Sequence, residues 1–141
     1  MLVAAGAAVF LVLGTLHLVL TFRGRALHPR DAALKARLEE VPLVITTETT
    51  MWKTWIGFNA SHSLGAMLFG LCYGYLALIE PHVLFASPFL ALVGAAFVAT
   101  FCWLGWRYWF SVPRRGIALA ALLYGAGLAT HYVQSLRGFD Q

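Results

Sequence analysis

The chain has 141 residues, of which 60% are hydrophobic and only 11% are charged, whereas about 25% of the residues of a typical soluble domain are charged. A soluble protein of this size needs more polar groups to cover its surface. The apolar residues also form long blocks, so the composition predicts one integral membrane domain over residues 1–141. The net charge of +4 does not indicate a nucleic-acid partner, because no glycine-rich phosphate loop, zinc-finger spacing or aromatic nucleic-acid platform accompanies it.

The first apolar block, residues 2–22, predicts a transmembrane helix about 31 Å long. A signal peptide carries its positive charge before the apolar run. Here the nearest basic residues, Arg23, Arg25 and Arg30, follow it. The helix is therefore expected to be retained.

A cytoplasmic loop over residues 23–53 comes next. Within it, residues 30–40 predict a short amphipathic helix, with Leu34, Leu38 and Val41 on one face. Such a helix is expected to lie in the membrane interface or over the cytoplasmic end of the bundle.

Three further apolar blocks predict transmembrane helices over residues 54–79, 83–110 and 116–136. The second helix can start earlier, because no helix breaker precedes it. Pro88 falls in the first turns of the third, where proline is best tolerated. The blocks are about twice as long as a transmembrane strand, so the fold class is an all-α bundle of four transmembrane helices.

The basic residues predict the orientation. Nine of the ten Lys and Arg residues lie in the first loop or at the junction between the third and fourth helices. The positive-inside rule puts this side in the cytoplasm and both termini outside. An aromatic belt is expected on the same side, made of Trp52, Trp55, Trp103, Trp106, Tyr108 and Trp109.

Polar residues at membrane depth carry most of the functional information, since they are costly there. In the second helix one face, at spacings of three and four, holds Trp55, Asn59, His62, Ser63 and Ala66. A second row of small residues, Gly57, Ser61 and Gly65, predicts a close approach to another helix.

His17 of the first helix and His62 are expected about 8 Å and 12 Å from the cytoplasmic end, so the two can meet at one depth. This predicts a polar pocket near the cytoplasmic side. Its candidate residues are His17, Glu48, Trp55, Asn59, His62, Ser63, Arg107 and Tyr108. Asn59 and Ser61 taken alone are better explained by hydrogen bonds between helices.

Three functions fit this pattern. One is binding, or proton chemistry, on a lipid-like or other apolar small molecule, with the histidines as proton carriers and Glu48 as their carboxylate partner. The second is haem b or a metal between the two histidines, which have no further ligands, so no metal site or cofactor is assigned. The third is a structural or accessory subunit without chemistry. No carboxylate lies within the apolar blocks, which disfavours a channel or pump.

A second polar face in the fourth helix holds Tyr124, His131 and Gln134, and His131 is expected to be a packing residue of the outer half. Cys72 and Cys102 are expected about 15 Å apart in depth, which excludes a disulfide between them.

Residues 49–70 resemble the signature region of an uncharacterised family of small bacterial four-helix membrane proteins. The matching pattern is Trp52, Gly57, Phe58, Asn59, Ser61, His62 and Gly65. The resemblance implies a protein of the bacterial inner membrane and supplies no activity. A looser likeness to sterol isomerase folds covers the architecture only, because the acidic intramembrane residues of those enzymes have no counterpart here.

Overall fold

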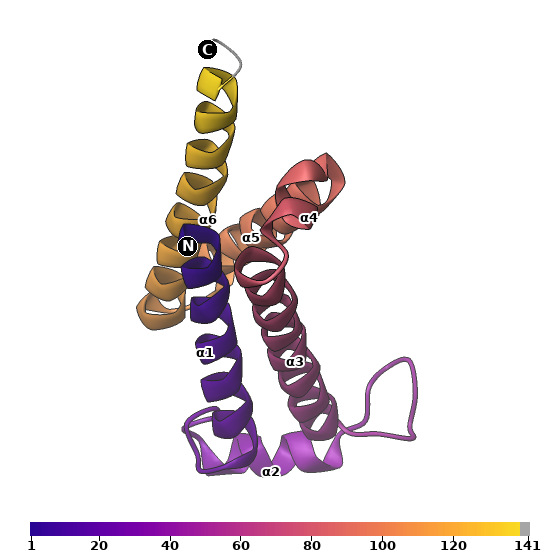
Figure 1. The fold of residues 1–141 in the computed structure, drawn as a ribbon. Coiled ribbons are helices and arrows are strands. Elements are labelled where there is room, and N and C mark those ends of the chain that lie inside the picture. The colour runs from indigo at the N-terminus through magenta and orange to yellow at the C-terminus, as the bar shows by residue number, and fades with distance from the viewer. Residues whose placement is uncertain (139–141) are drawn as a thin grey trace. The chain divides into compact units, whose positions relative to one another are not determined.

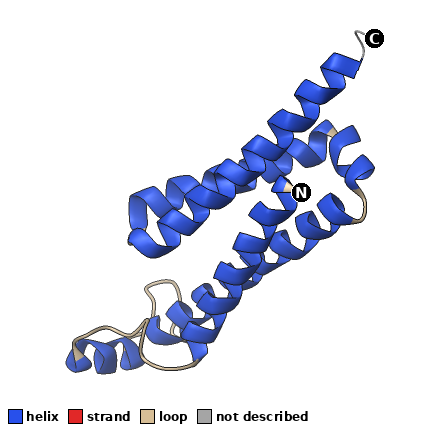
Figure 2. Ribbon diagram, turned by 60° about the vertical axis from the view of Figure 1, so that its left-hand side comes forward, coloured by secondary structure: helices blue, strands red, loops and turns tan. Residues whose placement is uncertain are grey.

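The computed structural model describes residues 1–138 and contains helices but no strand in that range (Figures 1 and 2). Three of the helices, α1, α5 and α6, are long and apolar enough to cross a membrane. The predicted all-α class is therefore confirmed, and three helices fit the predicted membrane protein by their length and apolar composition. In chain order the helices are α1 (Leu2–Phe22), α2 (Ala32–Glu40), α3 (Met51–Leu78), α4 (Pro81–Ala86), α5 (Pro88–Tyr108) and α6 (Ser111–Gly138).

The first two predicted transmembrane helices differ little from the structure. The predicted first helix has the bounds of α1. The predicted second helix, 54–79, starts three residues too late, because α3 begins at Met51. The Thr50 hydroxyl explains this start, since it accepts a hydrogen bond from the backbone N–H of Lys53 at 3.4 Å and so caps the helix.

The prediction of one continuous helix over 83–110 is wrong. The segment is divided at Ser87 into α4 and α5. Ser87 has an extended backbone, φ −107° and ψ 101°, as expected for a residue that precedes proline. Its side chain accepts a hydrogen bond from the Leu90 N–H at 3.3 Å, so Ser87 and Pro88 together start a new helix.

The contacts of the chain form two compact units, Met1–Leu13 with Ala66–Gln141, and Gly14–Gly65. An aromatic cluster fills the core of the first unit. The buried ring of Phe10 in α1 meets the rings of Phe69, Phe97 and Phe101 edge-on, at centroid distances of 5.0, 5.4 and 5.4 Å. Such edge-to-face pairs contribute beyond the area they bury.

Two buried tyrosines connect α3 and α6 to the first turns of α5. The Tyr73 hydroxyl donates to the Leu90 carbonyl at 2.8 Å, and the Tyr124 hydroxyl donates to the Ala91 carbonyl at 3.1 Å. Gly94 makes the space for them, because a Cβ there would lie 2.0 Å from the Tyr124 hydroxyl oxygen. The phenol groups are thus satisfied inside the core.

Close helix approaches in the first unit occur at glycines. A Cβ at Gly70 of α3 would lie 2.7 Å from the Cβ of Leu11 in α1, and one at Gly6 of α1 would lie 2.9 Å from the Ala120 carbonyl oxygen of α6. Backbones approach this closely only where a side chain is missing.

The row of Gly57, Ser61 and Gly65 is predicted to contact another helix, and this prediction is wrong for the two glycines. A Cβ at Gly57 or Gly65 would meet nothing within 4 Å. Small size alone does not distinguish a packed glycine from an exposed one on the same helix. The contact in α3 is made instead by Gly70.

The second unit contains the end of α1, the loop with α2, and the start of α3. Asp31 caps α2 by accepting hydrogen bonds from the N–H groups of Ala33 at 2.8 Å and Leu34 at 3.3 Å. The predicted short helix is therefore present. Of its predicted apolar face, Leu38 and Val41 are half-buried, while Leu34 remains 48% exposed.

Candidate functional site

The second unit brings together two of the predicted pocket residues, His17 of α1 and Asn59 of α3. The His17 Nε2 and the Asn59 Oδ1 lie 2.9 Å apart. The Asn59 Nδ2 donates to the Trp55 carbonyl at 2.7 Å, and this bond fixes the orientation of the amide. The Asn59 Oδ1 can only accept, so the His17 Nε2 carries the proton and donates it.

His62 lies beside this hydrogen bond. Its ring meets the His17 ring edge-on at a centroid distance of 5.6 Å, and it stacks against Phe58 at 6.4 Å. His62 is half-buried, whereas Asn59 is buried. The two predicted histidines therefore lie side by side in the structure. We call His17, Asn59 and His62 the polar cluster.

Hydroxyl groups on either side of the polar cluster bond to the backbone of their own helices. Thr21 donates to the His17 carbonyl at 2.8 Å, and Ser63 donates to the Asn59 carbonyl at 2.8 Å. Both side chains are buried. No buried side-chain nitrogen or oxygen of the described residues lacks a partner, as a low-dielectric setting demands.

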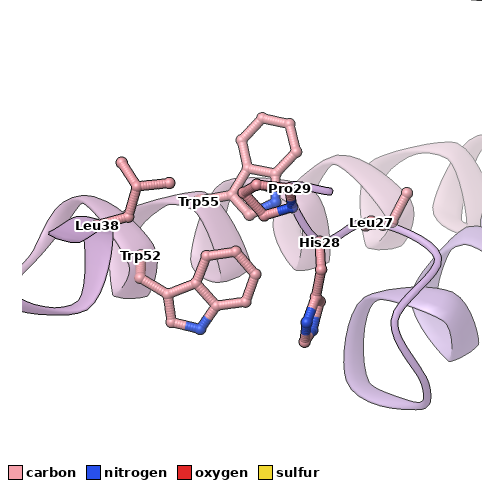
Figure 3. A pocket seen from close by; sticks show the side chains of 6 residues that line it. All are labelled: Leu27, His28, Pro29, Leu38, Trp52 and Trp55. Carbon is pink, nitrogen blue, oxygen red and sulfur yellow. The ribbon is translucent and has the colours of Figure 1, made fainter. Parts of the chain in front are cut away.

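A hollow of about 320 Å³ opens in the same unit (Figure 3). Trp52 and Trp55 come from the first turns of α3 and Leu38 from α2, and the turn after α1 completes the lining. In Figure 3, Leu38 lies at one end and Leu27 at the other, with both indoles and His28 between them. The lining residues are Leu27, His28, Pro29, Leu38, Trp52 and Trp55.

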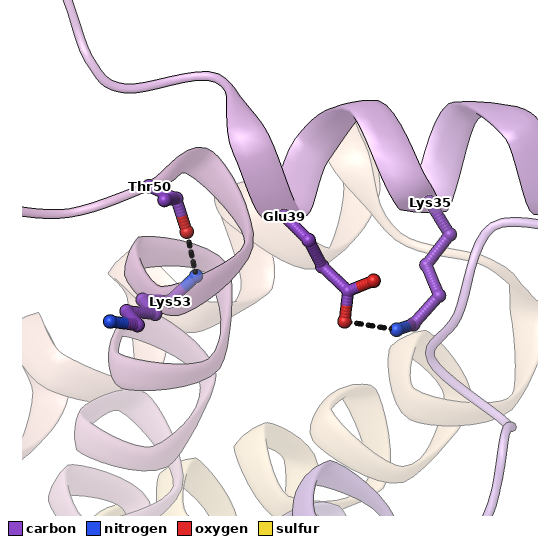
Figure 4. Close-up of polar contacts among 4 residues, drawn as sticks. All are labelled: Lys35, Glu39, Thr50 and Lys53. Atoms are coloured by element: carbon purple, nitrogen blue, oxygen red, sulfur yellow. Dashed lines mark hydrogen bonds and ion pairs between the residues drawn. The ribbon is translucent and has the colours of Figure 1, made fainter.

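The Trp52 ring is held from two sides. The His28 ring meets it edge-on at 4.9 Å, and the Lys35 ammonium lies 5.0 Å from its centroid. Lys35 also pairs with Glu39 one turn along α2 (Figure 4). A cation over an indole face is attracted by the ring quadrupole, so α2 is joined to the start of α3 at this wall of the hollow.

The hollow and the polar cluster share one turn of α3. Trp55 lines the hollow, and its backbone carbonyl accepts the Asn59 amide. Trp55 is itself 45% exposed. The second unit therefore offers an apolar surface next to a paired set of titratable and amide groups.

Three other predicted pocket residues belong to other elements of the chain. Glu48 is exposed in the loop before α3 and takes part in none of the ion pairs among residues 1–138. Arg107 and Tyr108 belong to the last turn of α5 in the first unit, where the guanidinium lies 5.4 Å from the phenol ring. None of the ion pairs described among residues 1–138 joins Glu48 to His17.

The second predicted polar face is divided among three environments. Tyr124 is buried in the core of the first unit, and Gln134 is exposed. His131 stacks on Phe85 of α4 at 4.0 Å, which is the contact of a packing residue. Cys72 and Cys102 are both free thiols.

Sequence reasoning did not identify the hollow. His28, Pro29 and Leu27 stand in a polar loop, with no periodic pattern that assigns them to a site. Trp52 was interpreted as an interfacial anchor. Only the folding of the loop against α3 brings them together.

Within the described part of the chain, no three His, Cys, Asp or Glu side chains gather in a group that could hold a metal ion. Comparison with family models, curated proteins and solved structures gives no match. The resemblance carried by residues 49–70 therefore stays a prediction.

Proposed function

We propose that this protein is an integral membrane protein that binds a lipid-like small molecule in the hollow of its second unit. The observation that carries the proposal is the lining of the hollow. Five of its six residues are apolar or indole-bearing, and His28 is the single strongly polar group. Pockets for apolar ligands combine such walls with few polar groups.

The proposal includes four membrane crossings, with α3 as the fourth beside α1, α5 and α6. Two contacts between α1 and α3 support this. Gly70 approaches Leu11 in the first unit, and His17 is bonded to Asn59 in the second. Since α1 is long and apolar enough to cross a membrane, a helix in contact with it at both places shares its depth. The buried Asn59 of α3 then faces α1 and not lipid.

The distribution of basic residues supports the orientation. In a four-crossing chain both termini lie outside, and the loop before α3 and the junction of α5 with α6 lie in the cytoplasm. The hollow is then at the cytoplasmic boundary of the membrane. A bacterial inner membrane is the proposed location, on the resemblance of residues 49–70.

We assign the polar cluster a positioning role in this function. The His17–Asn59 bond joins α1 to the turn of α3 that presents Trp55 to the hollow. His62, which is half-buried and takes no part in the His17–Asn59 bond, is the group best suited to exchange a proton with a bound molecule, since imidazole does so near neutral pH.

Native mass spectrometry of the purified full chain tests the hollow. Phosphatidylglycerol and phosphatidylcholine are added in detergent, and the bound lipid is counted. Leu38→Glu places a carboxylate in the hollow, and an unpaired charge in an apolar site is strongly unfavourable. We expect lipid retention to fall about tenfold or more. A tenfold loss corresponds to about 1.4 kcal/mol of binding free energy.

Leu34→Glu is the matched control, since Leu34 is on the same helix but is exposed and does not line the hollow. It should keep the lipid. Equal retention in the wild type and both variants would show that the hollow holds none.

The same spectra test the other two functions. A stable oligomer or copurified subunit without lipid would favour an accessory role. Haem between the histidines would require His17 to give up its bond to Asn59 or to bind through Nδ1. A Soret band in the absorbance spectrum of the purified protein would support that alternative.

A further inference from the structure

The loop between α2 and α3 presents two apolar side chains at its tip. Val44 is fully exposed and Ile45 is 88% exposed. Neighbouring Leu43 is half-buried, and Thr47 is exposed. Exposing two adjacent β-branched side chains to water is unfavourable, and burying them in an apolar environment would remove this cost.

The neck of this loop is closed. Pro42 and Thr50 form an isolated antiparallel bridge, and the Met51 N–H donates to the Val41 carbonyl at 2.9 Å. Residues 42–50 are thus held as a closed loop, whose ends are fixed at the C-cap of α2 and the start of α3. The exposed pair is presented by a defined structure and does not belong to an open tail.

The direction of the loop indicates what covers its two exposed apolar side chains. Within the second unit it leaves the junction of α2 with α3 and turns back toward the side to which α3 runs, away from α2 (Figure 1). The end of α1, which can cross a membrane, belongs to the same unit. The loop is therefore on the side of the α2–α3 junction along which α3 runs.

The charges of the unit fit an anionic lipid surface. The turn after α1 carries three exposed arginines, Arg23, Arg25 and Arg30, which make none of the ion pairs of the described residues. Basic residues beside a membrane are attracted by anionic headgroups. Thr47 and Glu48, which follow the apolar pair, are polar and exposed and can stay in water.

We infer that residues 42–50 form a membrane-dipping loop, with Val44 and Ile45 inserted among the lipids at the same boundary as the hollow. This surface goes beyond the proposed ligand site and does not depend on it, because neither Val44 nor Ile45 lines the hollow. The partner is the bilayer itself. Insertion would fix the loop that leads into α3 and so the start of that helix.

A polarity-sensitive fluorophore tests the loop in the full chain. Cys72→Ser and Cys102→Ser remove the native thiols, and Ile45→Cys is labelled with a nitrobenzoxadiazole probe in phosphatidylcholine–phosphatidylglycerol vesicles. We expect blue-shifted emission, most of which doxyl-labelled lipid quenches. Glu48→Cys in the same background is the control, and its emission should stay water-like and largely unquenched.

Two results would overturn the inference. Water-like emission at residue 45, as weakly quenched as at residue 48, would leave the tip in solvent. Blue-shifted emission that doxyl lipid does not quench would mean that a protein surface covers the tip, and its dependence on protein density would identify a second copy. Circular dichroism of the labelled variants checks that the helices are retained.

Discussion

At the scale of single residues, the bond between His17 and Asn59 has the clearest consequence. Asn59 accepts from one helix and donates to its own backbone, so its removal leaves an unpaired N–H on His17. Interhelical hydrogen bonds in membranes contribute roughly 0.6–2 kcal/mol. Ser61, by contrast, donates only to the Phe58 carbonyl of its own helix and is exposed.

We predict that Asn59→Ala destabilises the folded protein by about 1–2 kcal/mol, since the half-buried His17 donor loses its acceptor. Ser61→Ala should change stability by less than about 0.5 kcal/mol. Denaturant titration in detergent micelles, followed by circular dichroism, measures both. A double-mutant cycle with His17→Ala isolates the pair, and strictly additive losses would contradict the bond.

The polar cluster was largely predictable from the sequence, and the hollow was not. His17 and His62 were expected at one depth because helix rise fixes depth from residue number. Asn59 was expected on the same face from its spacing. His28 and Trp52 meet across a loop, whose path no periodicity determines. Glu48 was assigned to the site only because a carboxylate is a useful partner for histidine.

At the scale of elements, helix contacts depend on where a side chain is missing. Gly70 lies against Leu11, whereas Gly65 on the same helix meets nothing. The sequence could not separate them, because both are small residues on an apolar helix. Proline acts more simply, and Pro88 with Ser87 divides α4 from α5 by local geometry alone.

We predict that Gly70→Ala costs about 1–3 kcal/mol of stability, since the added methyl group would overlap the backbone of α1. The matched variant, Gly65→Ala, should be neutral or stabilise by about 0.5–1 kcal/mol through helix propensity. Thermal unfolding in detergent compares the two. Equal effects would show that α1 and α3 do not approach at Gly70.

At the scale of the whole molecule, composition determines the fold class. The polar residues of α3 make the number of membrane crossings harder to assign. Long apolar blocks predict most of the helices of the chain. They miss the break at Ser87, which one residue pair causes, and they miss the start of α6 at Ser111, five residues before the predicted start at 116. Three helices are apolar enough to cross by themselves. The first half of α3 carries Lys53, Asn59 and His62, which lower its hydropathy, so the proposed crossing of α3 depends on its contact with α1.

The crossing of α3 is the central claim, and the sidedness of the two segments that flank this helix tests it most directly. In a background lacking Cys72 and Cys102, single variants Arg30→Cys and His82→Cys are treated with a membrane-impermeant maleimide on intact cells and on inverted vesicles. Four crossings predict that residue 82 reacts in intact cells and residue 30 only in inverted vesicles. If both react from the same side, α3 does not cross and the four-helix account is wrong.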